Sequence, residues 1–267
     1  MNTIDIHDID DPRIASYREL PKLNPAHRAG HFIVEGFWGV QRVLASDFAV
    51  TSLLVADGEL AKVQDIVPPD TPVYVTNKAG INEIIGFRFH RGVLACAERP
   101  DPLAVADIVP PAPKPATVVA FPQTVDPENL AVSLRACAAF GVDGVLLGAG
   151  CADPFSRRVV RVSMGAVLTL PIVESTDLLS DLRGLTERDE LQSVATVLDP
   201  SAASLAEAKR SVRTLLLFGG EAHGLPREYV EQSNLRVTIP MRDGIDSLNV
   251  ATSVGVVLYH FQQIARK

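Results

Sequence analysis

The chain has 267 residues and a formal net charge of −7, from 25 basic and 32 acidic side chains. Hydrophobic residues make up 47% and charged residues 21% of the sequence, which excludes disordered and collagen-like chains. No apolar run is long enough to span a membrane, and the acidic N-terminus does not look like a secretory signal. Three scattered cysteines predict neither a disulfide framework nor a metal site. We therefore expect a cytoplasmic protein with no membrane or metal partner, and the net charge alone disfavours nucleic acid.

The prolines divide the chain. Eight of the 19 prolines fall between Pro100 and Pro127, and such a segment favours extended backbone without ladder hydrogen bonds. We predict a first domain over residues 1–101, a proline-rich linker over 102–115 and a second domain over 116–267.

The first domain begins with a polar arm that reaches to about residue 28. A helix is expected over residues 35–46, where Trp38, Val40, Val43 and Leu44 have near-helical spacing. Strands are expected at 50–56, 72–76 and 91–97. Together these elements predict a small α/β or α+β module.

The second domain alternates between strand and helix patterns. Strands are expected at 117–121, 144–148, 171–175, 193–198, 214–219 and 235–240. Helices are expected at 130–140, 156–163, 177–183, 202–210, 226–233 and 248–264. This alternation predicts a mostly parallel sheet with helices on both faces.

Common nucleotide signatures are absent. The glycines Gly148 and Gly150 follow a strand, but Asp153 stands where a dinucleotide-binding loop needs its third glycine. The sequence contains no phosphate-binding loop that ends in Gly-Lys-Ser/Thr and no clustered cysteine and histidine ligands. The chemistry must therefore come from other segments.

Asn129 and Arg135 belong to the first candidate segment, DPENLAVSLRACAAFGVDGVLL. Arg135 is the only charge between Asn129 and Gly141, so its guanidinium needs an acidic partner or an open cleft. The alternative is structural: Asn129 caps the helix, and Arg135 reaches a surface carboxylate.

A glycine-rich turn forms the second segment, where a buried strand enters Gly219-Gly220-Glu221-Ala222-His223-Gly224. Glycines there let a ligand approach the backbone, although a tight turn alone would also need them. Glu221 favours a ligand site, because it is expected at the carboxyl edge of a parallel sheet. His223 is expected to be an exposed turn residue.

Ser247 and Asn249 straddle the start of the terminal helix in the third segment. Capping by Asp246 or Ser247 is the structural alternative. Asn249 has less structural reason to be there, and the free amides of a helix start also provide a polar ligand site.

The order of these segments resembles the SpoU/TrmH family of RNA ribose 2′-O-methyltransferases, within the SPOUT superfamily. The matching motifs are Asn129 and Arg135 with AFGVDGVLL, then FGGEAHGL, then IPM followed by DSLNVATSVG. The intervening SRRVVRVSMGAVLTLPI also resembles this family, and the match covers about 150 residues. The segments EGFWGVQRVL and GFRFHRGVLACA resemble, more weakly, the ribosomal-protein-like substrate-binding domain that often precedes the catalytic domain.

The resemblance implies an α/β domain with a deep trefoil knot, which binds S-adenosylmethionine and forms a homodimer. It implies a catalytic set made of Asn129, Arg135, Glu221, Ser247 and Asn249. Arg135 would stabilise the developing alkoxide of the ribose, and Glu221 would pair with the partner's Arg135. The implied cofactor-binding residues are Gly219, Gly220, Gly224, Ile239, Met241 and Leu248. Ala131 departs from the family, which commonly has glycine at that position.

If the resemblance holds, the substrate is rRNA or tRNA, and local basic stretches contact its phosphates despite the negative net charge. These candidates are Arg28, Arg88, Arg91, Arg157, Arg158 and Arg161. The same stretches could instead be ordinary solvated faces. Two other functions stay open: an RNA-binding or assembly protein that has lost catalysis, and methylation of a base rather than a ribose.

Overall fold

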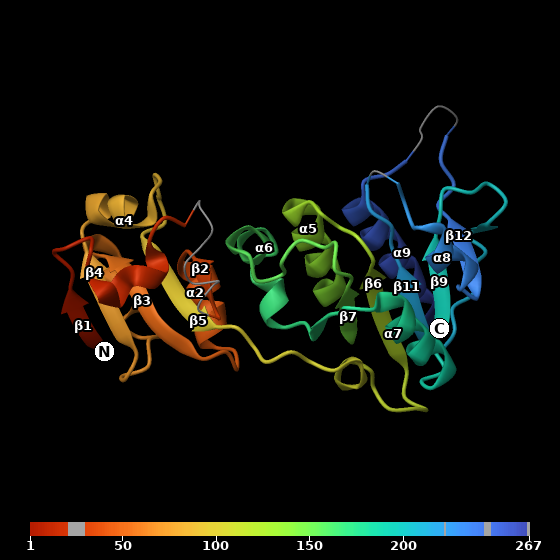
Figure 1. The fold of residues 1–267 in the computed structure, drawn as a ribbon, viewed down its shortest axis with the longest axis horizontal. Helices are drawn as coiled ribbons and strands as arrows, with labels where there is room; N and C mark the ends of the chain where they lie inside the picture. The colour runs from red at the N-terminus through yellow and green to blue at the C-terminus, as the bar shows by residue number, and fades with distance from the viewer. Residues whose placement is uncertain (21–29, 222, 243–246, 266–267) are drawn as a thin grey trace. The chain divides into compact units, whose positions relative to one another are not determined.

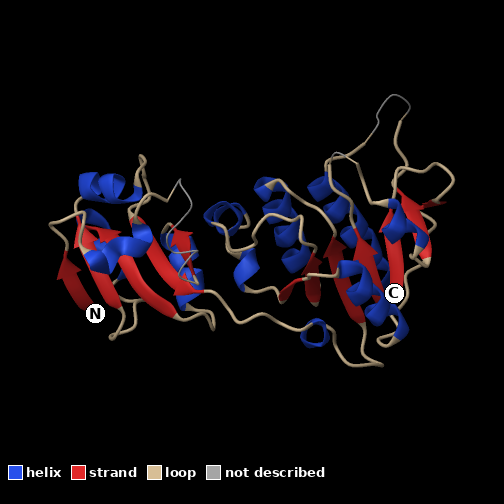
Figure 2. Cartoon of the chain, viewed as in Figure 1, coloured by secondary structure: helices blue, strands red, loops and turns tan. Residues whose placement is uncertain are grey.

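The computed structural model describes residues 1–20, 30–221, 223–242 and 247–265. The chain divides into two compact units (Figures 1 and 2). The first unit joins residues 1–101 with residues 155–168, and the second joins residues 102–154 with residues 169–267. No helix of the described residues is both long and apolar enough to cross a membrane.

The first unit is built on a five-stranded mixed sheet of strand order β1-β4-β3-β5-β2. Its strands are β1 (Asn2–Asp5), β2 (His31–Glu35), β3 (Val50–Ala56), β4 (Pro72–Thr76) and β5 (Val93–Glu98). Strand β5 runs antiparallel to β2 and β3, whereas β4 is parallel to β1 and β3. Its helices are η1 (Pro12–Tyr17), α2 (Phe37–Leu44), η2 (Asp57–Glu59), α3 (Leu60–Val63), α4 (Lys78–Ile85), α6 (Arg157–Val162) and η4 (Ala166–Leu168). The predicted α/β or α+β module and its three predicted strands are confirmed.

The prediction of a polar N-terminal arm is wrong for the described part of that segment. Strand β1 pairs with β4, and Ile14, Tyr17 and Leu20 are buried in the core of the unit. The Tyr17 hydroxyl donates a hydrogen bond to the Ser52 carbonyl oxygen at 2.8 Å. The mostly polar composition of this segment did not indicate its pairing and burial, because only a few apolar residues fix it to the sheet.

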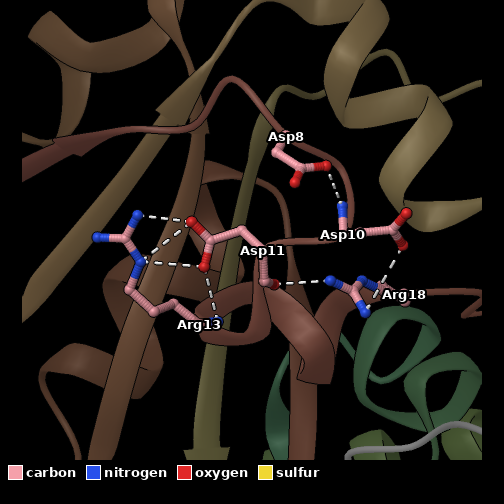
Figure 3. A network of polar contacts seen from close by, with 5 residues as sticks. All are labelled: Asp8, Asp10, Asp11, Arg13 and Arg18. Carbon is pink, nitrogen blue, oxygen red and sulfur yellow. Dashed lines mark hydrogen bonds and ion pairs between the residues drawn. The ribbon is translucent and has the colours of Figure 1, made fainter.

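The acidic residues of this segment form a local network that Figure 3 shows. Asp11 caps η1 through the Arg13 amide, and the Arg13 guanidinium holds the pKa of the Asp11 carboxyl down at about 2. Arg18 donates to the main-chain oxygens of Ile9 and Asp11, and it lies 4.0 Å from the Asp10 carboxylate. Part of the negative charge is therefore matched by nearby arginines.

The segment 155–168 packs on strand β2. The Phe155 ring lies against Phe32 and Phe48, with ring centroids 5.2 and 5.9 Å away. Arg157 donates to the Glu35 carboxylate at 2.5 Å, and Glu35 keeps only 2% of its side chain exposed. A buried carboxylate needs such a partner, so this ion pair fixes α6 to the first unit.

The second unit contains a seven-stranded sheet of order β10-β12-β9-β11-β6-β7-β8, in which every pair is parallel. Its strands are β6 (Ala116–Phe121), β7 (Gly144–Leu147), β8 (Ile172–Glu174), β9 (Gln192–Thr196), β10 (Ala203–Ser204), β11 (Arg213–Leu217) and β12 (Leu235–Thr238). The central strands read as continuous apolar runs because both faces of the sheet are covered.

Helices lie on both faces of this sheet (Figure 1). They are η3 (Val105–Ile108), α5 (Pro127–Ala139), α7 (Leu178–Glu187), α8 (Arg227–Glu231) and α9 (Val250–Ala265). Leu178, Leu182 and Leu185 of α7 are buried against alternate residues of the sheet, and α5 and α9 lie side by side. The predicted α/β class with a parallel sheet is confirmed.

The predicted helix over residues 202–210 is wrong. Residues 203–204 form β10, and the Leu205 amide donates to the Thr238 carbonyl oxygen at 2.8 Å beside β12. The alanine-rich sequence favours a helix locally. Pairing with the sheet edge and burial of Leu205 and Ala208 outweigh that preference.

The proline-rich stretch is anchored to the second unit. It contains η3, whose Ile108 is buried in the core beside β7. Arg213 is buried, and its guanidinium donates to the carbonyl oxygens of Asp189, Pro110 and Lys114 at 2.6 to 2.9 Å. These contacts hold the stretch against the start of β11.

Candidate active site

A cavity of about 490 Å³ opens at the carboxyl ends of β9, β11 and β12. The loop after β11, the segment after β12 and the start of α9 form its walls. All six predicted cofactor-binding residues line it: Gly219, Gly220, Gly224, Ile239, Met241 and Leu248. Glu221 and Ser247 line it as well. The parallel topology explains this convergence, because the carboxyl ends of parallel strands share one edge.

Two glycines of the loop after β11 are required by close backbone approach. A methyl group on Gly219 would lie 2.1 Å from the Gly224 carbonyl carbon and 2.2 Å from the Leu225 nitrogen. A methyl group on Gly220 would lie 2.3 Å from the Gln123 carbonyl oxygen. The Gly224 amide donates to the Gly220 carbonyl oxygen at 3.0 Å, which closes the turn. The loop is therefore a tight backbone wall, with no room for side chains at these two positions.

Three of the predicted catalytic side chains form one hydrogen-bonded chain. The Asn129 amide nitrogen donates to Glu221 Oε1 at 2.5 Å. The Asn249 amide nitrogen donates to Asn129 Oδ1 at 2.8 Å. These residues are 92 and 120 positions apart in sequence, and all three are exposed or half-buried. Since Glu221 also lines the cavity, the chain leads from α5 and α9 to the cavity wall.

The two asparagines have different structural roles. Asp126 caps α5 by accepting from the amides of Glu128 and Asn129, so the alternative that Asn129 is the cap is wrong. Asn249, in contrast, accepts from the amides of Ala251 and Thr252 at the start of α9. The expectation that Asn249 has less structural reason to be there is therefore wrong, because it caps the helix as well as bonding Asn129.

Ala131 does not displace Asn129. Its side chain is completely buried, whereas the Asn129 amide keeps hydrogen bonds to both Glu221 and Asn249. The methyl group that departs from the family pattern therefore adds to the core of the unit rather than to the exposed polar surface.

Arg135 does not take part in this hydrogen-bonded chain and is not among the residues that line the cavity. It is exposed on α5, and it makes no hydrogen bond or ion pair with any residue in the described part of the chain. Exposed apolar side chains occur on the same helix and on the neighbouring α9: Val132, Val256 and Tyr259. Within one chain, Asn129, Glu221, Ser247 and Asn249 thus form a site that lacks the predicted cation.

The predicted RNA-binding arginines fall into three groups. Arg88, Arg91 and Arg158 are exposed, and Arg28 lies outside the described residues. Arg157 and Arg161 face Glu35, at 2.5 and 3.8 Å, and the Arg157 guanidinium lies 4.5 Å over the Phe87 ring. The structure thus gives Arg157 a packing role inside the first unit, which its sequence position did not reveal.

Further contributors escaped the sequence analysis. Side chains at the ends of β9, β11 and β12 and on α9, mostly apolar, complete the cavity: Thr196, Phe218, Val237, Val250 and Val257. Their strand and helix patterns indicated burial but not which cavity they face. His223 is exposed, as expected, and lines the cavity rim. Within the described residues, no three acidic, histidine or cysteine side chains are grouped so that they could hold a metal ion.

The family model of the SpoU rRNA Methylase family matches residues 116–259. An uncharacterized tRNA/rRNA methyltransferase of Mycobacterium tuberculosis is 38% identical, over 96% of this chain and 90% of that protein. The 23S rRNA (guanosine(2553)-2′-O)-methyltransferase of Bacillus subtilis is 22% identical, over 96% of this chain and 98% of that protein.

Solved structures show the same architecture. The AdoMet-bound rRNA methyltransferase from Sinorhizobium meliloti has a TM-score of 0.81 at 25% identity and covers 97% of each chain. A solved RNA 2′-O ribose methyltransferase has a TM-score of 0.79 at 27% identity, over 99% of this chain and all of that chain. The family model covers more than half of the sequence, and a 38% identical relative covers nearly all of it, so the chain belongs to the SpoU rRNA methylase family.

Proposed function

We propose that the protein transfers a methyl group from S-adenosylmethionine to a ribose 2′-hydroxyl of rRNA or tRNA, as a cytoplasmic homodimer. The hydrogen-bonded chain from Asn249 through Asn129 to Glu221, at the wall of the cavity, carries this proposal. Two similar proteins, a 23S rRNA 2′-O-methyltransferase and an RNA 2′-O ribose methyltransferase, support ribose as the acceptor. The trefoil knot implied by the family stays a prediction.

The cavity suits S-adenosylmethionine in size and lining. Its volume of about 490 Å³ lies within the range of ligand pockets, and its walls combine apolar side chains with exposed backbone. We assign the cofactor's adenine and ribose to the backbone of Gly219, Ile239 and Leu248, beside Gly220, Gly224 and Met241. When bound, S-adenosylmethionine supplies an electrophilic methyl group on a positively charged sulfur.

The acceptor hydroxyl is a poor nucleophile until its developing negative charge is stabilised. A guanidinium keeps its proton at neutral pH, so we assign Arg135 to electrostatic stabilisation of the alkoxide rather than to proton removal. Asn129 is already held by Glu221 and Asn249, and it is the group that orients the ribose. Ser247 completes the polar wall on the cavity side.

A homodimer would supply the cation that one chain lacks at this site. Arg135 shares α5 with Val132, which is 45% exposed, and α9 carries Val256 and Tyr259, which are 39% and 57% exposed. Burial of these apolar side chains against a second copy would stabilise the pair. One oxygen of the Glu221 carboxylate accepts a hydrogen bond from Asn129, and we propose that the carboxylate also accepts one from the partner's Arg135.

RNA phosphates are assigned to exposed cations of the first unit. Arg88, Arg91 and Arg158 are exposed, and Arg161 keeps 35% of its side chain exposed beside Glu35. Such contacts position RNA without reading its sequence. Arg28, outside the described residues, stays in this set as a sequence prediction.

Methyl transfer to RNA tests the catalytic assignment. Asn129→Ala and Arg135→Ala should each lower kcat by about 10²- to 10³-fold, the usual cost of removing one group that stabilises an oxyanion. Arg183→Ala, which removes another exposed helical arginine of the second unit, should keep the wild-type rate. Calorimetry should show that all three variants still bind S-adenosylmethionine. Wild-type rates in both site variants would refute the assignment, and absence of transfer by the wild type with bound cofactor would favour an RNA-binding role.

A further inference from the structure

A second cavity, of about 400 Å³, is lined only by residues of the first unit, whereas the cofactor-sized cavity belongs to the second unit. Residues 35–39, at the end of β2 and the start of α2, form one wall, and α6 with the turn that follows it forms another. Glu59, Lys62, His90 and Arg91 complete the lining. None of the residues assigned to catalysis or to cofactor binding belongs to it.

Trp38 is the unusual residue of this cavity. It is the single tryptophan of the sequence, and it is 65% exposed although it belongs to a helix whose Val40 and Val43 are fully buried. Its ring and that of Phe37 form a T-shaped contact, with centroids 5.2 Å apart and planes at 75°, so the two rings do not stack face to face. A largely exposed indole, at the wall of a cavity that also contains charged side chains, offers a flat surface to a planar ligand.

The cavity is cationic in a chain that is otherwise acidic. Lys62, Arg91 and Arg161 line it against the carboxylates of Glu35 and Glu59. Lys62 lies 2.7 Å from Glu59, and Arg161 lies 3.8 Å from Glu35. Glu35 is further neutralised by the neighbouring Arg157, at 2.5 Å.

Arg91 is the cation of this cavity that does not belong to these ion pairs. Its guanidinium forms no hydrogen bond or ion pair with any other residue that the structure describes, and the residue is exposed. Its side chain crosses the start of α2, since a methyl group on Gly36 would lie 2.7 Å from Arg91 Cδ. It therefore lies beside the turn that carries Trp38, with His90 next to it in sequence and also exposed.

We propose that this cavity binds one unpaired nucleotide of the RNA, with its base stacked on Trp38 and its phosphate held by Arg91. A flat aromatic face beside an uncommitted guanidinium matches the two parts of a nucleotide. A base inside a duplex has no free face for the indole, so the nucleotide comes from a loop, a bulge or a single strand. This inference rests on the proposed function only in taking RNA as the substrate.

Trp38 is its own reporter, because the sequence contains no other tryptophan. Titration of the wild-type protein with a short single-stranded RNA oligonucleotide should quench the tryptophan emission saturably. A fully paired RNA of the same length should quench far less. Heparin, a polyanion without bases, should compete for the cations without quenching.

Variants separate stacking from charge in a fluorescence-anisotropy assay with labelled single-stranded RNA. Trp38→Ala should weaken binding about tenfold or more, whereas Trp38→Phe should stay within about threefold because it keeps an aromatic face. Arg91→Glu should also weaken binding and reduce its salt dependence. Lys78→Glu reverses an exposed cation of α4 that does not line the cavity, so it should change the affinity for RNA and its salt dependence less than Arg91→Glu does.

Binding without quenching, or equal affinity of Trp38→Ala and the wild type, would overturn the inference. An emission change that follows protein concentration without RNA would also overturn it, by making this face a contact between copies of the chain. Failure of the proposed function looks different: quenching and the Trp38 effect would persist while no RNA is methylated. Conversely, methylation with unchanged KM in Trp38→Ala would remove the nucleotide site and leave the catalytic assignment intact.

Discussion

Gly219→Ala tests whether the loop after β11 needs its close backbone approach. The added methyl group would lie 2.1 Å from the Gly224 carbonyl carbon and 2.2 Å from the Leu225 nitrogen. Carbon atoms in contact are normally about 3.5–4.0 Å apart, so the backbone at Gly219 and the backbone at Gly224 and Leu225 must separate by more than about 1 Å. The obstructing atoms are main chain, so no rotation of a side chain can relieve the overlap.

Overpacking of this kind costs about 1–3 kcal/mol. For a unit of this size, 1 kcal/mol lowers the Tm by about 2–4 °C, so the variant should melt roughly 2–12 °C below the wild type. Because Gly219 lines the cavity, the Kd for S-adenosylmethionine should rise about tenfold or more, equivalent to at least about 1.4 kcal/mol. Calorimetric titration and thermal unfolding measure the two effects.

Gly255→Ala is the matched control. Gly255 lies within α9, and apart from its own helical turn no atom in the described part of the chain lies within 4 Å of the methyl group that alanine would add. Alanine is the better helix former, so this variant should bind the cofactor normally and gain about 0.5–1 kcal/mol of stability. A Gly219→Ala protein that binds and melts like the wild type would refute the packing argument for this loop.

Three further predictions concern stability and thiol chemistry. Arg213→Ala removes the buried guanidinium that donates to three main-chain carbonyl oxygens, so it should lower the free energy of unfolding, measured in urea, by about 2–4 kcal/mol. An unchanged free energy of unfolding would contradict the anchoring role of Arg213. Glu35→Gln leaves the Arg157 guanidinium, whose side chain is 24% exposed, without its carboxylate partner, so the free energy of unfolding should fall by about 2–3 kcal/mol in the same measurement. A variant as stable as the wild type would show that the ion pair does not contribute to stability. Burial raises the pKa of the thiols of all three cysteines, Cys96, Cys137 and Cys151, so a thiol reagent at mildly alkaline pH should react quickly only after the protein unfolds. Fast labelling of the native protein would contradict this burial.

The sheet of the second unit was predictable because its strands are buried on both faces. Runs such as residues 118–121 of β6 and residues 215–218 at the end of β11 are wholly apolar, and the sequence between them carries helix patterns, so the order of elements follows. The stretch 202–210 failed for the opposite reason. Its local composition favours a helix, whereas a pairing with β12, more than 30 residues away, decides its structure. Sequence spacing does not contain such long-range pairings.

The candidate site shows the same division. The structure brings Gly219, Glu221 and Asn249 of the predicted set into one region, but no spacing rule indicates that Asn129 bonds both Glu221 and Asn249. The capping role of Asn249 was also hidden, because its partners depend on where α9 begins. Arg135 looked like part of a single site, and its isolation on α5 emerges only from the fold.

The position of the methyl group on the product tests the central claim most directly. RNA treated with the protein and S-adenosylmethionine would be digested to nucleosides and analysed by mass spectrometry. We expect a nucleoside methylated at the ribose 2′-oxygen with the wild type, and near-complete loss of this product with Asn129→Ala. A methyl group on a base, or an undiminished ribose product from Asn129→Ala, would contradict it.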